Sequence, residues 1–299
     1  MNQFMPEITD AWVLDFLDSI DMAGLAELEA QHLLRTYIDE AIFFWRFLRP
    51  LIIERKPIDA MEVGSGVGLL SLFASSEVKE LTSLEPESAG FGTMSEFRDI
   101  IERAWRSENM PVFTDSFVHD LPRDKTFDFI YCLNVLEHVP QAERLIEEIY
   151  GRLNPGGLAW FVSPNYSFPY EQHFEIPIFF NKRITERVFG NRIRNHQVSS
   201  DPVGLWAELS WPTQRRLRRF LRSRAWSHQF QRNVLGGYFE RLSEPHFIQR
   251  KGTLYRSLRP LLKVLKPAIL ALPLGVAPII EFTISKPSTS QSKSADLRP

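Results

Sequence analysis

The segment 61–68, Met-Glu-Val-Gly-Ser-Gly-Val-Gly, constrains the fold of this chain more than any other. A mostly apolar run, 58–63, leads directly into it, and a second strand-like run, 81–84, ends at Glu85, 21 residues after Gly64. This order predicts a strand, a glycine-rich turn, a helix, and a second strand that ends in a carboxylate. Such a unit holds a nucleoside, because glycines let the backbone approach the ligand and the carboxylate accepts hydrogen bonds from the ribose hydroxyls.

The spacing of the glycines excludes two common nucleotide-binding motifs. A dinucleotide fingerprint would need a third glycine at Leu69, and a P-loop would need a lysine followed by serine or threonine. The chain has instead the pattern Gly64-x-Gly66-x-Gly68, with Glu62 two residues before the first glycine.

This pattern resembles the start of class I S-adenosylmethionine-dependent methyltransferases, and two later segments agree with it. Residues 127–139, Phe-Asp-Phe-Ile-Tyr-Cys-Leu-Asn-Val-Leu-Glu-His-Val, resemble the fourth strand of that family and its exit loop. Residues 153–157, Leu-Asn-Pro-Gly-Gly, with the apolar run 158–162, resemble the turn and the fifth strand. Over residues 55–165 the chain is similar to the quinone-biosynthesis O-methyltransferase group, which implies S-adenosylmethionine as the cofactor and methyl transfer as the activity.

Alternating strand and helix patterns continue to residue 165 and predict an α/β fold with a parallel sheet between two layers of helices. The resemblance implies a doubly wound, mostly parallel, seven-stranded sheet of the Rossmann-like methyltransferase type. Pro50 and Pro57 are expected to separate the N-terminal helices from the first strand. We expect five segments, namely an N-terminal helical cap (1–54), a cofactor-binding core (55–166), a basic, mainly helical acceptor or lid insertion (167–278), a final sheet strand (279–285) and a disordered tail (286–299).

The cysteine content and the N-terminus bear on the location of the protein. Cys132 is the one cysteine among 299 residues, so an internal disulfide is excluded and a reducing compartment is expected. We expect Cys132 to be a small buried residue within a strand. The N-terminus has no basic and then apolar leader, so a secretory signal is not expected and the predicted location is cytoplasmic.

Charge is distributed unevenly along the chain. Residues 1–166 contain 13 Lys and Arg against 28 Asp and Glu, whereas residues 167–266 contain 19 against 7. This asymmetry predicts that the second half meets an anionic partner. A helix-like segment, 212–226, carries six arginines, and three interpretations stay open: a solvated helix face, a surface for anionic lipid or a phosphate-bearing acceptor, and a nucleic-acid surface. The last is disfavoured because the whole chain is acidic.

The motif match implies a role for each residue around the cofactor. The glycines would lie against its methionine part and its sugar, Glu62 would organise the loop and reach the amino group, and Glu85 would accept from the ribose hydroxyls. Relatives have an aspartate four residues before a Leu-Pro pair, where this chain has Phe117, so either Asp115 or a stacked Phe117 would contact the adenine. The predicted cofactor-binding residues are Glu62, Gly64, Ser65, Gly66, Gly68, Glu85, Asp115, Leu133 and Asn134, the last two beside the reactive methyl group.

Two histidines are candidates for the general base on the acceptor side. His173 follows the fifth strand within an aromatic segment, and histidine is the natural base near neutral pH. His138 lies in the exit loop of the fourth strand, where the residues of relatives more often shape the loop. The alternative for His173 is a packed, hydrogen-bonded side chain. No group of histidines and cysteine has the spacing of a zinc site, so no metal is predicted.

The sequence thus predicts an S-adenosylmethionine-dependent methyltransferase that methylates a hydroxyl of a small-molecule, lipid-like or glycan-precursor acceptor. Peripheral contact with an anionic membrane is compatible with the basic half, nucleic acid is not an expected partner, and the oligomeric state is left open. Two alternatives remain: a non-catalytic cofactor-binding or membrane-scaffold module, and an RNA or protein methyltransferase. The second is weakened because residues 134–137 are Asn-Val-Leu-Glu and not the Asn/Asp-Pro-Pro-aromatic tetrapeptide of amino-group methylases.

Overall fold

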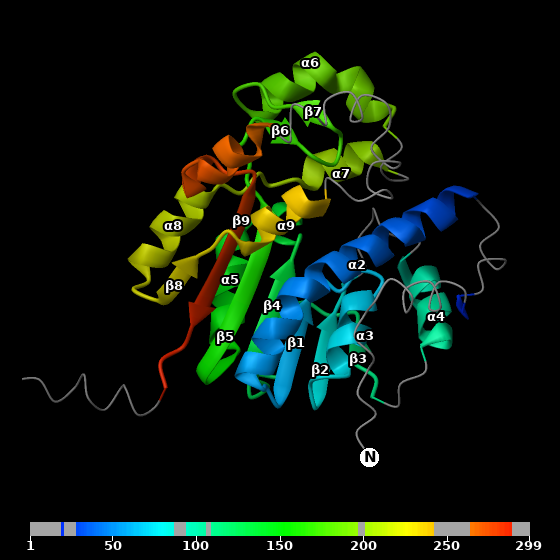
Figure 1. Ribbon diagram of the computed structural model, residues 1–299, viewed down its shortest axis with the longest axis vertical. Helices are drawn as coiled ribbons and strands as arrows, with labels where there is room; N and C mark the ends of the chain where they lie inside the picture. The colour runs from blue at the N-terminus through cyan, green and yellow to red at the C-terminus, as the bar shows by residue number, and fades with distance from the viewer. Residues whose placement is uncertain are drawn as a thin grey trace, which may run out of the picture. The chain divides into compact units, whose positions relative to one another are not determined.

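The computed structural model describes residues 19–20, 28–86, 94–105, 109–196, 201–241 and 264–288. Its main sheet has seven strands in the order β3-β2-β1-β4-β5-β9-β8, with helices on both sides (Figure 1). The predicted fold class is therefore confirmed. The strands are β1 (Asp59–Val63), β2 (Glu80–Leu84), β3 (Val112–Thr114), β4 (Phe127–Leu133), β5 (Leu153–Pro164), β8 (Ser227–Phe230) and β9 (Ile279–Ser285), and a separate small sheet pairs β6 (Tyr170–Glu171) with β7 (Ile176–Pro177).

The helix-like segment 212–226 is helical over residues 214–223. Helix α2 contains Pro50 and ends at Arg55, one residue beyond the predicted end of the N-terminal helical cap. Residues 264–271 are also helical. The α-helices are α2 (Leu28–Arg55), α3 (Leu69–Ser75), α4 (Met94–Ala104), α5 (Ala142–Gly151), α6 (Lys182–Arg194), α7 (Pro202–Glu208), α8 (Gln214–Ser223) and α9 (Asn233–Arg241), and the short 3-10 turns are η2 (Val118–Asp120), η3 (Leu136–His138) and η4 (Leu274–Val276).

Parallel pairing brings the ends of the first strands to one edge of the sheet. The last residue of β1, Val63, is paired with Leu84 on β2 and with Cys132 on β4, and Leu84 is paired with Thr114 on β3. The residues that follow β1, β2 and β3 therefore lie at the same edge. Ligands bind at this edge in parallel α/β sheets, and the glycine turn begins there at Gly64.

The last strand runs antiparallel to β5. The amide of Gly156 donates to the carbonyl of Lys286 at 3.0 Å, and the amide of Asn165 donates to the carbonyl of Pro278 at 2.8 Å. Residue numbers therefore rise along one strand and fall along the other. Strand β8 pairs antiparallel with β9, from Ser227 opposite Ser285 onwards. β8 lies within the segment that we expected to be mainly helical. The sequence did not predict this strand, because its four residues, Ser-His-Gln-Phe, are too few to show a strand period.

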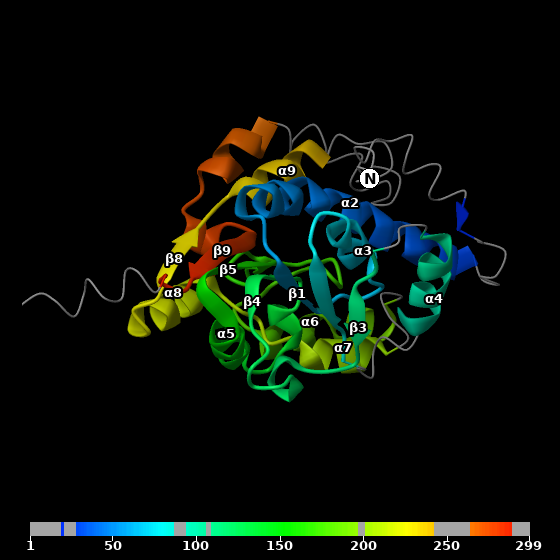
Figure 2. The same cartoon turned by 90° about the horizontal axis from the view of Figure 1, so that it is seen from below.

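The chain packs into two compact units, each with its own core. The first contains residues 1–132, 148–159 and 286–299, and the second contains 133–147 and 160–285. In the first unit, α2 and α3 cover one face of β1, β2 and β3 (Figure 2). Cys132 is buried and free there, as predicted. The largest fully buried side chains are Phe73, Phe97, Phe127, Phe129 and Tyr131 in the first unit and Trp160, Phe161, Phe174 and Phe282 in the second.

Parts of four predicted segments lie outside the described residues. They are 1–18 and 21–27 of the N-terminal cap, 87–93 and 106–108 of the cofactor-binding core, 197–200 and 242–263 of the basic insertion, and 289–299 of the predicted disordered tail. Among the described helices, none combines the length and the apolar character needed to span a bilayer.

Candidate functional site

The turn after β1 requires glycine at its key positions. Gly64, Gly66 and Gly68 all have positive φ angles, of 77°, 53° and 80°. The amide of Gly64 donates to the carbonyl of Leu84 at 2.8 Å, which holds the turn against the end of β2. A Cβ atom at Gly68 would lie 2.7 Å from the ring of Phe113, so a larger residue there needs both backbone strain and displacement of an aromatic side chain.

The same turn leaves space and an open polar group for a ligand. A Cβ atom at Gly66 would meet no heavy atom within 4 Å, which indicates open space beside the backbone. The hydroxyl oxygen of Ser65 is buried and has no hydrogen-bond partner within the described part of the chain. A bound polar ligand would satisfy this hydroxyl. These features fit the predicted nucleoside cofactor.

Glu85 contacts the glycine turn directly. The amide of Gly66 donates to Oε2 of Glu85 at 2.6 Å, and Arg98 on α4 donates to the carbonyl of Gly66 at 2.9 Å. Burial raises the pKa of Glu85, although the Gly66 amide and the charge of Arg98 oppose this effect. The carboxylate predicted to hold the ribose is thus held beside the turn by the Gly66 amide, and Arg98, which the motif did not indicate, binds the same turn.

Glu62 is the centre of a buried polar network. The side chain is only 4% exposed. Its Oε2 accepts a hydrogen bond from the hydroxyl of Ser71 and another, at 3.1 Å, from the hydroxyl of Tyr131. The hydroxyls of Ser71 and Ser83 are 2.5 Å apart. Burial raises the pKa of Glu62 to about 8, and the two hydroxyl donors only partly offset this. Glu62 is therefore protonated at neutral pH unless a positive charge comes close to it.

Asp115 lies at the end of β3 and is exposed. Its carboxylate is 4.0 Å from a guanidinium nitrogen of Arg98, so Arg98 links the glycine turn after β1 to the end of β3. Phe117, the alternative adenine contact, is also exposed, and its ring stacks on that of His119 with the centroids 5.3 Å apart. Neither arrangement decides between the two residues, and the adenine contact stays a prediction.

Leu133 and Asn134 end β4 and begin the second unit. Leu133 is buried, and Asn134 adopts a left-handed conformation with φ of 54°. The amide of Asn134 donates to the carbonyl of Val162 on β5 at 2.9 Å. Asparagine tolerates this conformation better than most residues, which explains its place at the turn. Their predicted role beside the reactive methyl group is untested.

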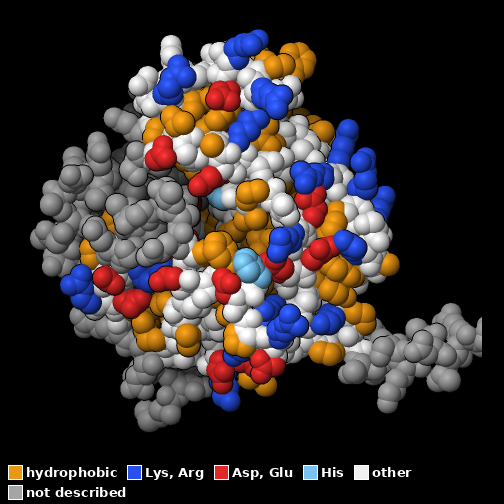
Figure 3. Space-filling view, turned by 180° about the vertical axis from the view of Figure 1, so that it is seen from behind, with side chains coloured by type: hydrophobic (Ala, Val, Ile, Leu, Met, Phe, Trp, Pro, Cys, Tyr) orange, Lys and Arg blue, Asp and Glu red, His pale blue; other side chains and the backbone are white. Residues whose placement is uncertain are grey.

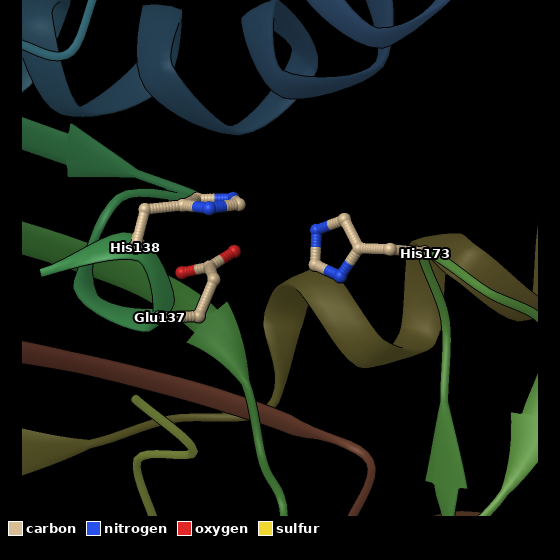
Figure 4. A group of neighbouring side chains, drawn as sticks. All are labelled: Glu137, His138 and His173. Atoms are coloured by element: carbon tan, nitrogen blue, oxygen red, sulfur yellow. The ribbon is translucent and has the colours of Figure 1, made fainter. Parts of the chain in front are cut away.

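The second unit brings both predicted base candidates together. Glu137, His138 and His173 offer ligand atoms that all lie within 4.8 Å of one another (Figure 4). The two histidine rings meet edge to face, with their centroids 5.2 Å apart. Glu137 is fully buried, one of its oxygens accepts from the hydroxyl of Ser163 at 3.0 Å, and the other has no hydrogen-bond partner among the described residues. Burial raises the pKa of Glu137 to about 7.

His173 is oriented by a second buried acid. Its Nδ1 lies 2.6 Å from Oε1 of Glu171, which also accepts from the hydroxyl of Tyr166 at 3.2 Å. The amide of Phe174 donates to the other oxygen of Glu171 at 2.7 Å. Burial acts to raise the pKa of Glu171, but the hydrogen bond and charge of His173 and the Phe174 amide bring it below its ordinary value. An ionised Glu171 therefore accepts the Nδ1 proton.

This arrangement makes His173 a better general base than His138. In its neutral form, with its proton on Nδ1, His173 presents an unprotonated Nε2, and that atom points toward His138 and Glu137 in Figure 4. Burial, together with the positive charge that His173 carries when it is protonated, lowers the pKa of His138 to about 3, so His138 is neutral and weakly basic. The same three side chains could hold a metal ion, an arrangement that the sequence did not reveal because its ligands are 35 residues apart.

The sequence missed the supporting residues of both clusters. Ser71 and Tyr131 bind Glu62, Arg98 binds the glycine turn, and Glu171 binds His173. A weak signal existed for Glu171 alone, because it stands two residues from His173 in the segment after the fifth strand.

Comparison with known proteins agrees with this geometry. A family model described as a methyltransferase domain matches residues 31–233. An uncharacterised protein of Mycobacterium tuberculosis (strain H37Rv) is 36% identical over 214 residues, which cover 69% of this chain and 72% of that protein. The ubiquinone biosynthesis O-methyltransferase of Rickettsia felis is 24% identical over 103 residues, 34% of this chain and 39% of the relative.

The solved structures that are similar to this chain include a plantazolicin methyltransferase in complex with a monoazolic desmethylPZN analog and SAH. It is 11% identical, with a TM-score of 0.47, and the alignment covers 93% of this chain and 98% of that one. The family match spans the glycine turn, Glu85 and the segment 127–139 that first suggested the assignment. The chain therefore belongs to the methyltransferase domain family, and the predicted class of S-adenosylmethionine-dependent methyltransferases, with S-adenosylmethionine as cofactor, is confirmed.

Proposed function

We propose that this protein methylates a hydroxyl group of a small-molecule, lipid-like or glycan-precursor acceptor. S-adenosylmethionine, when bound, supplies a methyl group already activated on a sulfonium. The protein's own task is to hold the reactants in line and to remove the acceptor proton. Orientation can lower the barrier by as much as about 7–11 kcal/mol, and a general base typically adds about 100- to 10,000-fold.

The contact between Gly66 and Glu85 is the observation that carries the cofactor site. Glu85 would accept from the ribose hydroxyls, and the glycine turn would lie against the methionine part and the sugar. Ser65 offers a buried hydroxyl without a partner within the described part of the chain, which supports a polar ligand at this turn. Glu62, neutral before binding, would ionise when the ammonium group of the cofactor approaches, because a nearby positive charge favours the carboxylate.

The Glu171–His173 pair supports proton transfer from an acceptor hydroxyl. Glu171 fixes the proton of His173 on Nδ1, so that Nε2 is the atom that would take the hydroxyl proton. Glu171 is a positioning residue in this proposal. His138 and Glu137 lie on the Nε2 side and would help to exclude water, since Glu137 is fully buried.

Calorimetric titration with S-adenosylhomocysteine tests the cofactor site. Glu85→Ala should weaken binding at least about tenfold, or 1.4 kcal/mol. Glu80→Ala is the matched control, since Glu80 is an exposed acid at the opposite end of the same strand. Failure of the folded wild-type protein to bind, or equal effects of the two substitutions, would contradict the proposed site.

Incubation with methyl-labelled cofactor and fractionated lysate tests the reaction. Label should enter a lipid, glycan-precursor or small-molecule fraction, and His173→Ala should lower incorporation by about 100-fold or more while it leaves S-adenosylhomocysteine binding unchanged. A parallel assay with a chelator and with added divalent metal shows whether Glu137 and His138 serve a cation instead. Label in RNA or protein, or cofactor binding without any transfer, would favour the alternatives.

A further inference from the structure

Helix α6 has a row of apolar side chains that face solvent. Phe180, just before the helix, is 93% exposed, and Ile184 and Val188 are 41% and 56% exposed. Ile184 and Val188 are four residues apart, so they line one side of the helix, and Phe180 precedes its first turn. The opposite side is closed, because Thr185 and Ile193 are buried. The exposed apolar side chains therefore take no part in the core of this unit.

A basic row runs beside the apolar one. Arg183, Arg187 and Arg194 line a hollow of about 410 Å³ together with Asn191 and one acid, Glu186. Arg194 donates to the side-chain oxygen of Asn191 at 2.6 Å, but Arg183 and Arg187 form no ion pair with any residue that the structure describes. Figure 3 shows basic and hydrophobic side chains next to one another at the top of the view, over α6.

The arginines of α8 are used differently. Arg216 pairs with Glu143 and Arg224 pairs with Glu147, both on α5, and the guanidinium of Arg218 lies 4.9 Å from the centroid of the Phe230 ring. These contacts hold α8 within its own unit. The arginine-rich segment that we singled out in the sequence is thus partly neutralised, whereas the basic row on α6 is not.

Phe180 is held outward at a cost. Its φ is 54°, in the left-handed region, where a bulky residue is strained. The next residue, Asn181, caps α6 by accepting the amide of Ile184 at 3.0 Å, so the turn is fixed by the helix that follows. Strain of this kind at an exposed aromatic ring is typical of positions kept for function.

We propose that this face of α6 docks on an anionic bilayer surface. Arg183, Arg187 and Arg194 would bind lipid phosphates around the hollow, and the row that starts at Phe180 would enter the boundary between headgroups and acyl chains. The positive charge of this face favours an anionic bilayer over a second copy of the chain. The helix carries five basic residues and one acid, Glu186, so two such faces would repel each other.

Vesicle co-sedimentation tests the docking surface. The wild-type protein should bind vesicles of phosphatidylcholine with one-quarter phosphatidylglycerol and should not bind vesicles of phosphatidylcholine alone. The double variant Arg183→Gln/Arg187→Gln should bind the anionic vesicles about 25-fold more weakly, since each basic side chain near such a surface contributes about fivefold. The control Arg219→Gln/Arg222→Gln removes the same charge from exposed positions of α8 and should change binding less than about twofold.

The apolar row needs a separate variant. Phe180→Ser/Val188→Ser should weaken binding to anionic vesicles by about tenfold or more, and its melting temperature should match that of the wild type because both side chains are exposed. Equal binding to neutral and anionic vesicles, or equal losses in the α6 and α8 variants, would overturn the proposal. So would a wild-type dimer in sedimentation velocity that the Phe180→Ser/Val188→Ser variant disrupts, since a second copy would then cover this face.

Discussion

Replacing Glu62 with glutamine should remove a strong pH dependence from the stability of this protein. Burial raises the pKa of Glu62 from 4.5 to about 8 in the folded chain. In the unfolded chain the carboxyl group returns to its ordinary value. Between these two values the folded state binds one proton more than the unfolded state, so the free energy of unfolding falls as pH rises.

The sign and size of the effect follow from this difference. The contribution of Glu62 is fully present below about pH 4.5 and is lost as pH rises through the folded pKa. Each pH unit in that window costs about 1.4 kcal/mol, so the shift amounts to about 5 kcal/mol in total. Since Glu62 is only 4% exposed, solvent does not screen this contribution. Glutamine has nearly the same shape and cannot ionise.

Urea unfolding followed by tryptophan fluorescence measures this directly between about pH 5 and pH 9. The stability of Glu62→Gln minus that of the wild type should grow by about 1.4 kcal/mol per pH unit up to about pH 8 and then level off. Glu54→Gln is the control, because it makes the same substitution at an exposed position near the end of α2.

A constant difference between wild type and Glu62→Gln over this range would refute the reasoning. It would mean that Glu62 is ionised in the folded protein, with Ser71 and Tyr131 donating to a carboxylate strongly enough to overcome burial. The same experiment with saturating S-adenosylhomocysteine should flatten the wild-type curve, because the ligand's ammonium group would lower the pKa of Glu62 toward its ordinary value.

Three further outcomes are expected. Calorimetry at pH 7 in buffers of different ionisation enthalpy should show that S-adenosylhomocysteine releases protons from the wild type and not from Glu62→Gln. Gly68→Ala should lower the free energy of unfolding, measured with urea, by about 1–3 kcal/mol through backbone strain and the clash with Phe113. Gly236→Ala on α9 is the control, because a Cβ atom there has open space and should not destabilise the protein. Glu171→Gln should lower kcat and move the acid limb of its pH profile, while the Kd for S-adenosylhomocysteine stays unchanged, because its role is to orient the base.

The features that sequence predicted well are those encoded by neighbouring residues. The glycine turn at 64–68 follows a short buried strand, and its positive φ angles are ones that glycine adopts without penalty. Glu85 was found because it ends the next strand, and parallel register then places it at the same edge as Gly64. Local period and chain order therefore sufficed for the first strands of the sheet and for the proximity of Glu85 to the glycine turn.

The features that sequence did not predict depend on packing between distant segments. Arg98 reaches Gly66 across 32 residues, and Tyr131 reaches Glu62 across 69. Neither spacing belongs to a local period, and arginine on an amphipathic helix is ordinary at the surface. Strand β8 was missed for a related reason, since its pairing with β9 joins Phe230 to Phe282 and no pattern within β8 itself marks it.

Burial alone does not decide the charge of a carboxylate, and the two clusters show this side by side. Glu62 and Glu171 are both buried, yet the pKa of the first rises to about 8 and that of the second falls below its ordinary value. Among the described residues, the donors to Glu62 are both hydroxyls, which stabilise an anion weakly. Glu171 accepts from a backbone amide and faces His173, and these two interactions offset the loss of hydration. The first acid is thus ready to ionise for an arriving cation, and the second is ionised in advance to hold a histidine tautomer.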